Sequence, residues 1–326
     1  MNNTAPSIFI VDDEPSNLFI LSEYLEDDYR LSTAEDGKIA LRMLESEPEH
    51  FDIILLDRMM PNMDGIEVLA RLKEHAVLKQ CPVILQTART GKEDILEGVK
   101  AGAYYYLPKP FDEDMLFSVV KAALRERQNY KDLQHALQKT TPTSELMDIA
   151  KFRFKNREQV RGLASLLANT CPAPESVVLG LWELMVNAVE HGNLGITYQE
   201  KSLLIKQENW AGEVKKRLSL EENRDKCASI EFQRKSDCIE FTIRDQGKGF
   251  DWIPYIQMSW DRATACHGRG IAMAGRVSFS RIEYRGCGNE VFAVVDCLPS
   301  TDRERATDTA SGHSLQRYEP SIDTAQ

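Results

Sequence analysis

Several features are scarce or missing in this chain of 326 residues, and each absence excludes a class of protein. No uninterrupted apolar run approaches the roughly 18 residues that a membrane-spanning helix requires, so we expect no contact with a membrane. The first residues, MNNTAPSIFIVDD, lack the basic region and the cleavage site of a signal peptide. The sequence therefore predicts a cytoplasmic protein.

Cysteine occurs, but never as a CxxC pair. The seven cysteines are odd in number and scattered along the chain. Reduced thiols are typical of such a pattern in a cytosolic protein. We therefore expect neither a zinc site nor a disulfide framework.

An excess of positive charge is also missing. The formal net charge is −11, and residues 1–122 alone hold 23 acidic side chains against 12 basic ones. The rest of the chain is electrically balanced. Because nucleic-acid binding depends on a surplus of Lys and Arg, this charge distribution argues against a general nucleic-acid partner.

The length and the pattern of the chain predict two domains, because 326 residues exceed one ordinary hydrophobic core. Residues 1–122 contain five short apolar runs, each followed by a segment with helical periodicity. Continuously apolar strands that alternate with helices indicate a parallel sheet covered on both faces. The expected fold of this segment is α/β, a doubly wound five-stranded parallel sheet.

Polar side chains follow the predicted strands at the points where the strands end. They are Asp12 and Asp13 after the first strand, Asp57 at the end of the third, Thr87 at the end of the fourth and Lys109 after the fifth. Any one of them could be an ordinary polar cap. Because ligands bind at the carboxyl ends of parallel strands, the set predicts a functional site at one edge of the sheet.

Residues 6–122 resemble the receiver domain of bacterial response regulators, through VDDEP, LLDRMMPNMDG, TA and LPKPF in that order. The resemblance implies a flavodoxin-like fold in which Asp57 takes a phosphoryl group from a cognate histidine kinase or a phosphotransfer protein. It also implies that Asp13, Asp57 and the carbonyl of Met59 hold Mg²⁺, and that Asp12 acts through a bound water.

The same resemblance assigns further roles. Lys109 would pair with the phosphoryl oxygens, and Thr87 would donate a hydrogen bond to them. Tyr106 matches the switch aromatic of the family, and Pro110 matches its usual cis-proline.

Residues 123–147 continue a helical pattern, and most of this segment has no glycine or proline. Within it Ala123, Tyr130 and Leu137 recur every seven residues, with Leu133 beside them. This stripe is shorter than the three to four heptads that indicate a coiled coil. We expect a rigid signalling helix, with a homodimer seam as the alternative.

The stretch LWELMVNAVEHGN places Glu183, Asn187 and His191 at a spacing of four, which stacks them on one face of a helix. A polar row of this kind is common and has no specific meaning alone. Further along, a predicted strand ends in DQGKG, which contains Asp245, and HGRG opens a predicted helix.

In that order, the three motifs resemble the GHKL-type ATP-binding fold, an α+β sandwich, over residues 148–299. They look most like the anti-sigma-factor serine/threonine kinases of bacterial partner switching. The resemblance implies that Asn187 coordinates the Mg²⁺ that bridges the phosphates of ATP, and that Glu183 is the catalytic base. Asp245 would accept a hydrogen bond from the adenine amino group, and His191 would cap the helix.

The resemblance also assigns backbone contacts to the nucleotide. The residues concerned are Gly247 and Gly249 near the base, and Gly268, Arg269 and Gly270 near the phosphates at a helix N-terminus.

Two departures from the family pattern are visible. The family has Gly-Thr near the last strands, where this chain has GNEV, so Asn289 must supply that adenine contact or the contact is lost. Residues 194–227 form a charged insertion with a helical pattern, which compact anti-sigma-factor kinases lack. Residues 300–326 are polar and predict a disordered tail.

Two functions remain open. In the first, an aspartate-phosphorylated regulator controls a kinase that phosphorylates an anti-sigma-factor antagonist on Ser or Thr. In the second, the ATP-bound domain only sequesters a sigma factor or an antagonist. Glu183 favours the first, because binding alone needs no base. A histidine kinase is disfavoured, since His135 lacks the acidic residue and the proline that follow a phospho-accepting histidine.

Overall fold

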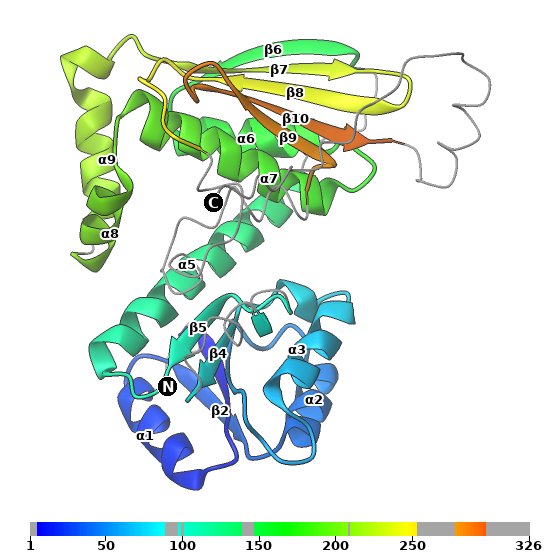
Figure 1. Ribbon diagram of the computed structural model, residues 1–326, viewed down its shortest axis with the longest axis vertical. Coiled ribbons are helices and arrows are strands. Elements are labelled where there is room, and N and C mark those ends of the chain that lie inside the picture. Colours follow the sequence, from blue (N-terminus) through cyan, green and yellow to red (C-terminus); the bar gives the residue numbers. More distant parts are fainter. Residues whose placement is uncertain are drawn as a thin grey trace, which may run out of the picture.

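The computed structural model describes residues 5–88, 97–98, 101–138, 147–207, 209–252 and 278–297. These residues form two five-stranded sheets, each with its own helices, and one long helix runs between the two parts (Figure 1). In the part of the chain that the structure describes, no helix is both long and apolar enough to cross a membrane.

The first sheet is parallel, with the strand order β2-β1-β3-β4-β5. Its strands are β1 (Ser7–Val11), β2 (Arg30–Ala34), β3 (Ile53–Asp57), β4 (Val83–Thr87) and β5 (Tyr105–Pro108). Strands β1, β3 and β4 are buried along their whole length. Their continuous apolar runs are explained by helices on both faces, so the predicted doubly wound sheet is confirmed.

Each face of this sheet has its own core. One core is formed with α1 (Pro15–Leu25) and the first half of α5 (Glu113–Gln138), the other with α2 (Gly37–Ser46) and α3 (Gly65–Glu74). A short 3-10 turn, η1 (Leu78–Gln80), precedes β4. The helix starts are set by local sequence. Asp36 accepts a hydrogen bond from the Lys38 amide at 2.6 Å, and Asp64 forms a capping box with Glu67.

The second sheet is antiparallel, with the order β6-β7-β8-β10-β9. Its strands are β6 (Ile149–Phe154), β7 (Ala228–Arg234), β8 (Cys238–Arg244), β9 (Arg281–Arg285) and β10 (Glu290–Asp296). Burial alternates along β7, β8 and β10, which is typical of a sheet with one buried face and one solvated face.

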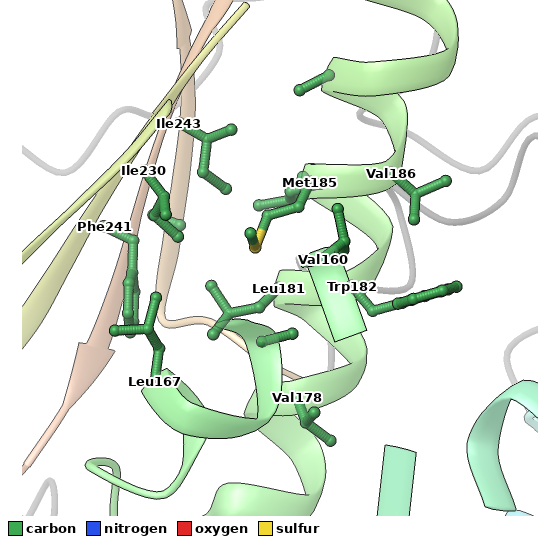
Figure 2. Packing of buried hydrophobic residues seen from close by; sticks show 14 of the residues in the cluster. Val160, Leu167, Val178, Leu181, Trp182, Met185, Val186, Ile230, Phe241 and Ile243 are labelled. Atoms are coloured by element: carbon green, nitrogen blue, oxygen red, sulfur yellow. The ribbon is translucent and has the colours of Figure 1, made fainter. Parts of the chain in front are cut away.

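The buried face of the second sheet packs on α6 (Arg157–Ala168) and α7 (Pro174–Asn187). Leu181 and Met185 of α7 point toward Ile230, Phe241 and Ile243 of the sheet (Figure 2). After Asn187 the chain continues as a π-helical turn, η3 (Ala188–Asn193). The single α-helix predicted for the whole polar row is therefore wrong in its last part, because His191 lies on the π-helical turn.

The predicted insertion is helical, as expected. It contains α8 (Tyr198–Lys206), α9 (Trp210–Ser219) and the 3-10 turn η4 (Glu221–Asn223). Thr197 and Glu200 form a capping box at the start of α8. Arg217 of α9 donates a hydrogen bond to Glu200 of α8 at 2.6 Å, and this bond links the two helices.

Helix α5 contributes to one core of the first sheet and to the core of the second part. Leu116 and Ala123 lie in a core of the first sheet, whereas Leu133 and Leu137 lie in the core of the second part. The helix also packs against α6 and α7. The apolar stripe that suggested a homodimer seam is thus buried largely within the chain itself. His135 is exposed on this helix.

Candidate functional site

Three of the predicted residues meet at the edge of the first sheet. Asp12 directly follows β1, Asp57 ends β3 and Lys109 directly follows β5. The Lys109 Nζ atom lies 2.8 Å from Asp12 Oδ2 and 2.5 Å from Asp57 Oδ1. Both carboxylates are almost fully buried. The strand ends therefore place one ammonium group between two buried carboxylates.

Other groups hold these two carboxylates in place. Asp12 accepts hydrogen bonds from the Asn17 side chain at 3.0 and 3.1 Å and from the Glu14 amide at 3.0 Å. The Met59 amide donates to Asp57 Oδ2 at 2.6 Å. Burial raises the pKa of Asp57, although the hydrogen bond from Lys109 opposes this, and the nearby charge of Asp12 raises it further.

The remaining predicted residues of this edge lie around that centre. Thr87 is fully buried at the end of β4, and Asp13 is half-buried beside Asp12. The peptide bond between Lys109 and Pro110 is cis, which confirms that prediction. Tyr106 is fully buried.

The sequence analysis assigned no role to Arg58, which also lies in this region. Its side chain is almost fully buried directly after Asp57. It donates a hydrogen bond from Nη1 to the Tyr106 hydroxyl at 2.8 Å and forms an ion pair with Glu97. Arg58 therefore holds Tyr106 from the position next to the candidate phosphorylation site.

The acidic edge suits a hard divalent cation. Burial and mutual repulsion disfavour the ionised form of Asp57, and a cation with oxygen ligands would relieve both effects. Among the described residues, no three His, Cys, Asp or Glu side chains are grouped as a metal site. The expected set needs only two such side chains, Asp13 and Asp57, with the carbonyl of Met59, and it remains a prediction.

Residues 8–121 match the family of response regulator receiver domains. This segment is a receiver domain. Response regulator PleD of Caulobacter vibrioides is 42% identical over 119 residues, which are 36% of this chain and 26% of PleD. Transcriptional regulatory protein CpxR of Escherichia coli is 36% identical over 140 residues, which are 43% of this chain and 57% of CpxR. The solved structure of chemotaxis protein CheY4 of Vibrio cholerae is 31% identical, covers 37% of this chain and 100% of CheY4, and has a TM-score of 0.35.

The receiver domain explains the chemistry of the first sheet. Receiver domains bind Mg²⁺ for phosphorylation, and they imply a phosphodonor such as a histidine kinase. The chain spans only 26% of PleD and 57% of CpxR, so the activities of those whole proteins are not transferred to this chain.

The second candidate site begins on α7. Glu183 and Asn187 lie one helical turn apart and are half-buried, while their apolar neighbours Leu184 and Val186 are buried. Burial raises the pKa of the Glu183 carboxyl to about 7, and the nearby charge of Glu126 on α5 adds to this shift. A carboxyl group that titrates near neutral pH can accept a proton and release it again.

The DQGKG loop lies against the end of this helix. Asp245 follows β8, and its Oδ1 accepts a hydrogen bond from the Gly247 amide at 2.7 Å. Burial raises the pKa of Asp245 to about 6. Asn193 Oδ1 accepts a hydrogen bond from the Gln246 amide at 2.8 Å, which joins the loop to the π-helical turn. The structure thus brings the two predicted motifs together.

The turn between β9 and β10 completes this arrangement. The Asp245 amide donates to the carbonyl oxygen of Asn289 at 3.0 Å, so Asn289 lies beside Asp245. Its contact with adenine stays a prediction. Gly249 has a positive φ of 75°, and a Cβ atom there would lie 1.9 Å from the carbonyl oxygen of Cys287. Only glycine fits at this contact.

Sequence reasoning missed a buried ionic group next to the polar row. Glu190 on the π-helical turn is fully buried. It accepts a hydrogen bond from Arg157 at 2.8 Å and another from Lys201 at 3.1 Å. The only signal was a charged residue among apolar neighbours in NAVEHGN. Its partners, on α6 and in the insertion, could not be assigned from spacing.

His191 has a structural role in this arrangement. Its Nδ1 atom is hydrogen-bonded to the carbonyl oxygen of Ile196, and burial lowers the pKa of the imidazole. This bond ties the π-helical turn to the start of the insertion, whereas the predicted cap would bond a carbonyl group at the end of the helix. The predicted phosphate contacts, Gly268, Arg269 and Gly270, lie outside the described residues, as does the tail at 300–326.

Proposed function

We propose that this protein is a response regulator whose phosphorylation on Asp57 controls an ATP-dependent protein kinase in its second domain. The kinase domain is of the GHKL type, and its substrate is a Ser or Thr hydroxyl of an anti-sigma-factor antagonist in a partner-switching pathway. The observation that supports this most is Glu183, a carboxyl group with a pKa raised to about 7, one turn from Asn187.

The geometry around Glu183 suits phosphoryl transfer. Asn187 offers a neutral oxygen ligand for the Mg²⁺ that accompanies ATP, and Asp245 offers a hydrogen-bond acceptor for the adenine amino group. Glu183 would take the proton of the partner hydroxyl, whose oxygen forms a bond to the γ-phosphorus while ADP leaves with the electron pair of the broken bond.

The receiver chemistry is likewise a balanced transfer. The Asp57 carboxylate would attack the phosphorus atom of a phosphohistidine or of a small acyl phosphate. The bond from phosphorus to the donor would break, and the donor would leave as histidine or as the free carboxylic acid. Lys109 already contacts Asp57 and would neutralise the added phosphoryl oxygens. Mg²⁺ would neutralise the crowded carboxylates and orient the donor.

Helix α5 supports control of one site by the other. It carries residues of both cores without interruption, and its Glu126 lies near enough to Glu183 to affect the pKa of that group. A small movement of α5 relative to the receiver domain would therefore reach the face of α7 that bears the base. Coupling of this kind typically amounts to about 1–3 kcal/mol.

The competing function is a binding module, in which the second domain sequesters a sigma factor or an antagonist without transferring a phosphoryl group. The two functions make different demands on Glu183. A module that only binds ATP and a partner does not need a carboxyl group titrating near neutral pH on its nucleotide face. Glu183 is therefore the residue that separates them.

The test uses the full chain, radiolabelled ATP and candidate antagonist proteins from the same genome. Glu183→Gln keeps the size of the side chain but removes the proton acceptor, so ATP binding should persist while transfer falls by roughly 10²–10⁴-fold. Asn187→Ala should abolish Mg²⁺-dependent ATP binding. A wild-type protein that binds ATP and partner tightly without moving a phosphoryl group would establish the binding module instead.

A further inference from the structure

Three aromatic side chains gather beside Asp245, and no role has been assigned to them so far. Phe250 and Trp252 lie in the loop after β8, and Tyr284 lies on β9. The Phe250 ring meets the Tyr284 ring edge-on, with centroids 5.4 Å apart. The Trp252 ring stacks on Tyr284 at 6.1 Å, with an angle of 21° between the planes.

Strand register places Tyr284 on the same face of the sheet as Asp245. Tyr284 pairs with Val291 across β9 and β10, and Val291 pairs with Ile243 across β10 and β8. Ile243 and Val291 face the core beneath the sheet. Asp245 lies two residues after Ile243 and therefore points to that same face. Tyr284 and Asp245 thus lie on the same face of the sheet, the one covered by α7, with β10 between β9 and β8.

The phenol of Tyr284 remains neutral at this position. Burial raises its pKa, and the charges of Asp245 and Glu183 raise it further.

Tight backbone contacts fix the aromatic cluster. The Phe250 amide donates to the carbonyl oxygen of Cys287 at 3.0 Å. A Cβ atom on Gly288 would lie 2.4 Å from the carbonyl oxygen of Phe250 and 3.0 Å from Cε3 of Trp252. Because the loop and the turn approach each other so closely, the three rings are held in place before any ligand arrives.

We propose that Tyr284, Phe250 and Trp252 form an aromatic wall for the base of the bound nucleotide, with Asp245 at its edge. This inference rests on the proposed ATP-binding function of the second domain. Aromatic rings provide a flat apolar surface for a nucleobase, and the Asp245 carboxylate accepts a hydrogen bond from an exocyclic amino group. The wall therefore contributes affinity for the base, whereas contacts to the phosphates are independent of it.

The test compares two ligands by calorimetric titration of the full chain in the presence of Mg²⁺. ATP carries a base, and inorganic tripolyphosphate does not. Tyr284→Leu should weaken ATP binding by roughly five-fold to hundred-fold, the usual loss for one base–aromatic contact, and should leave tripolyphosphate binding unchanged. The control is Phe292→Leu, which removes a ring from β10 whose centroid lies 4.2 Å from Arg285 Cζ and which does not join the cluster.

The outcomes separate this inference from the proposed function. If wild type binds ATP and Tyr284→Leu binds it equally well, the aromatic wall is overturned and the ATP site stands. Equal losses for ATP and tripolyphosphate would also overturn the wall, because they would indicate general damage. If wild type binds no ATP, the proposed function fails.

Trp252 offers a second readout. ATP should change the fluorescence of the protein, and Trp252→Phe should remove that change while Trp210→Phe, in the insertion, retains it. A change that persists in Trp252→Phe would count against a base lying at this wall.

Discussion

Gly192 and Asp245 lie in direct contact, because a Cβ atom on Gly192 would lie only 2.3 Å from the carboxyl carbon of Asp245. Gly247 makes a similar approach, and its Cβ atom would lie 2.4 Å from the carbonyl oxygen of Gly192. The π-helical turn and the DQGKG loop therefore fit together only with glycine at both places. This contact unites two motifs that are more than fifty residues apart in the sequence.

Gly192→Ala should damage the second site. The added methyl group must displace the Asp245 carboxylate or the turn, and overpacking of this kind costs about 1–3 kcal/mol in the free energy of unfolding. We also expect weaker ATP binding, because Asp245 loses its position. Both quantities are measurable, by denaturant unfolding and by calorimetric titration.

The matched control is Gly162→Ala on α6, where nothing lies within 4 Å of the added Cβ atom. Alanine is a better helix former than glycine by about 1 kcal/mol, so this variant should be as stable as wild type or more stable. If Gly192→Ala matches the control in both stability and ATP affinity, the contact does not matter for the site.

Much of the first domain could be predicted from the sequence. Its three central strands are largely apolar runs, its helices have clear periodicity, and parallel strands must bring their carboxyl ends to one edge. The meeting of Lys109, Asp12 and Asp57 at one edge follows from that topology. Local pattern and chain topology were sufficient because each of these residues lies at the end of a strand or directly after it.

Contacts between distant elements could not be predicted in the same way. Arg58 bonds Tyr106, and Glu190 bonds Arg157 and Lys201, through side chains whose directions depend on tertiary packing. The π-helical turn was also unforeseen, because the spacing of polar residues predicts a regular α-helix. Periodicity indicates which face of an element is buried, but it does not identify the partner on another element.

Asp57→Asn should abolish labelling of the protein by radioactive acetyl phosphate, because an amide cannot act as the nucleophile. The control is Asp52→Asn. Asp52 directly precedes the first residue of β3, at the end of the strand opposite Asp57, and its carboxylate forms an ion pair with Lys131 at 2.6 Å. The control should be labelled at close to the wild-type rate. Wild-type labelling of Asp57→Asn would show that another residue carries the phosphoryl group.

The rate of phosphoryl transfer to the partner hydroxyl should rise with pH and level off above about pH 7. Burial raises the pKa of Glu183 to about 7, and only the ionised form accepts a proton, so the active fraction grows as pH increases through that value. The measurement is the transfer rate at saturating ATP and partner between pH 5.5 and 8.5. A rate independent of pH would argue against Glu183 as the base.

The raised pKa of Glu183 also predicts how the stability of the protein depends on pH, and this dependence is opposite in sign to that of the transfer rate. Between its ordinary pKa of 4.5 and the raised value of about 7, the folded protein binds a proton at Glu183 more tightly than the unfolded chain. The contribution of Glu183 to the free energy of unfolding should therefore fall as pH rises through this window. Glu183→Gln should remove that contribution, which denaturant unfolding at several pH values can detect.

The last prediction concerns the helix that joins the two sites. Gln128 is exposed on α5, between Ala123 in the receiver core and Leu133 in the second core. Gln128→Pro removes a backbone hydrogen bond and breaks or kinks the helix, at a cost of about 3 kcal/mol or more. Gln128→Ala is the control, since it also loses the hydrogen bond from the Gln128 side chain to Asp132 but keeps the helix.

Both variants should still be labelled on Asp57 and should still bind ATP, because Gln128 lies in neither site. The measured quantity is the ratio of transfer rates with and without acetyl phosphate. In wild type and Gln128→Ala we expect a ratio that differs from one by several-fold or more, and in Gln128→Pro a ratio close to one. If Gln128→Pro keeps the wild-type ratio, the signal does not pass along α5, and another contact between the receiver domain and the second domain must carry it.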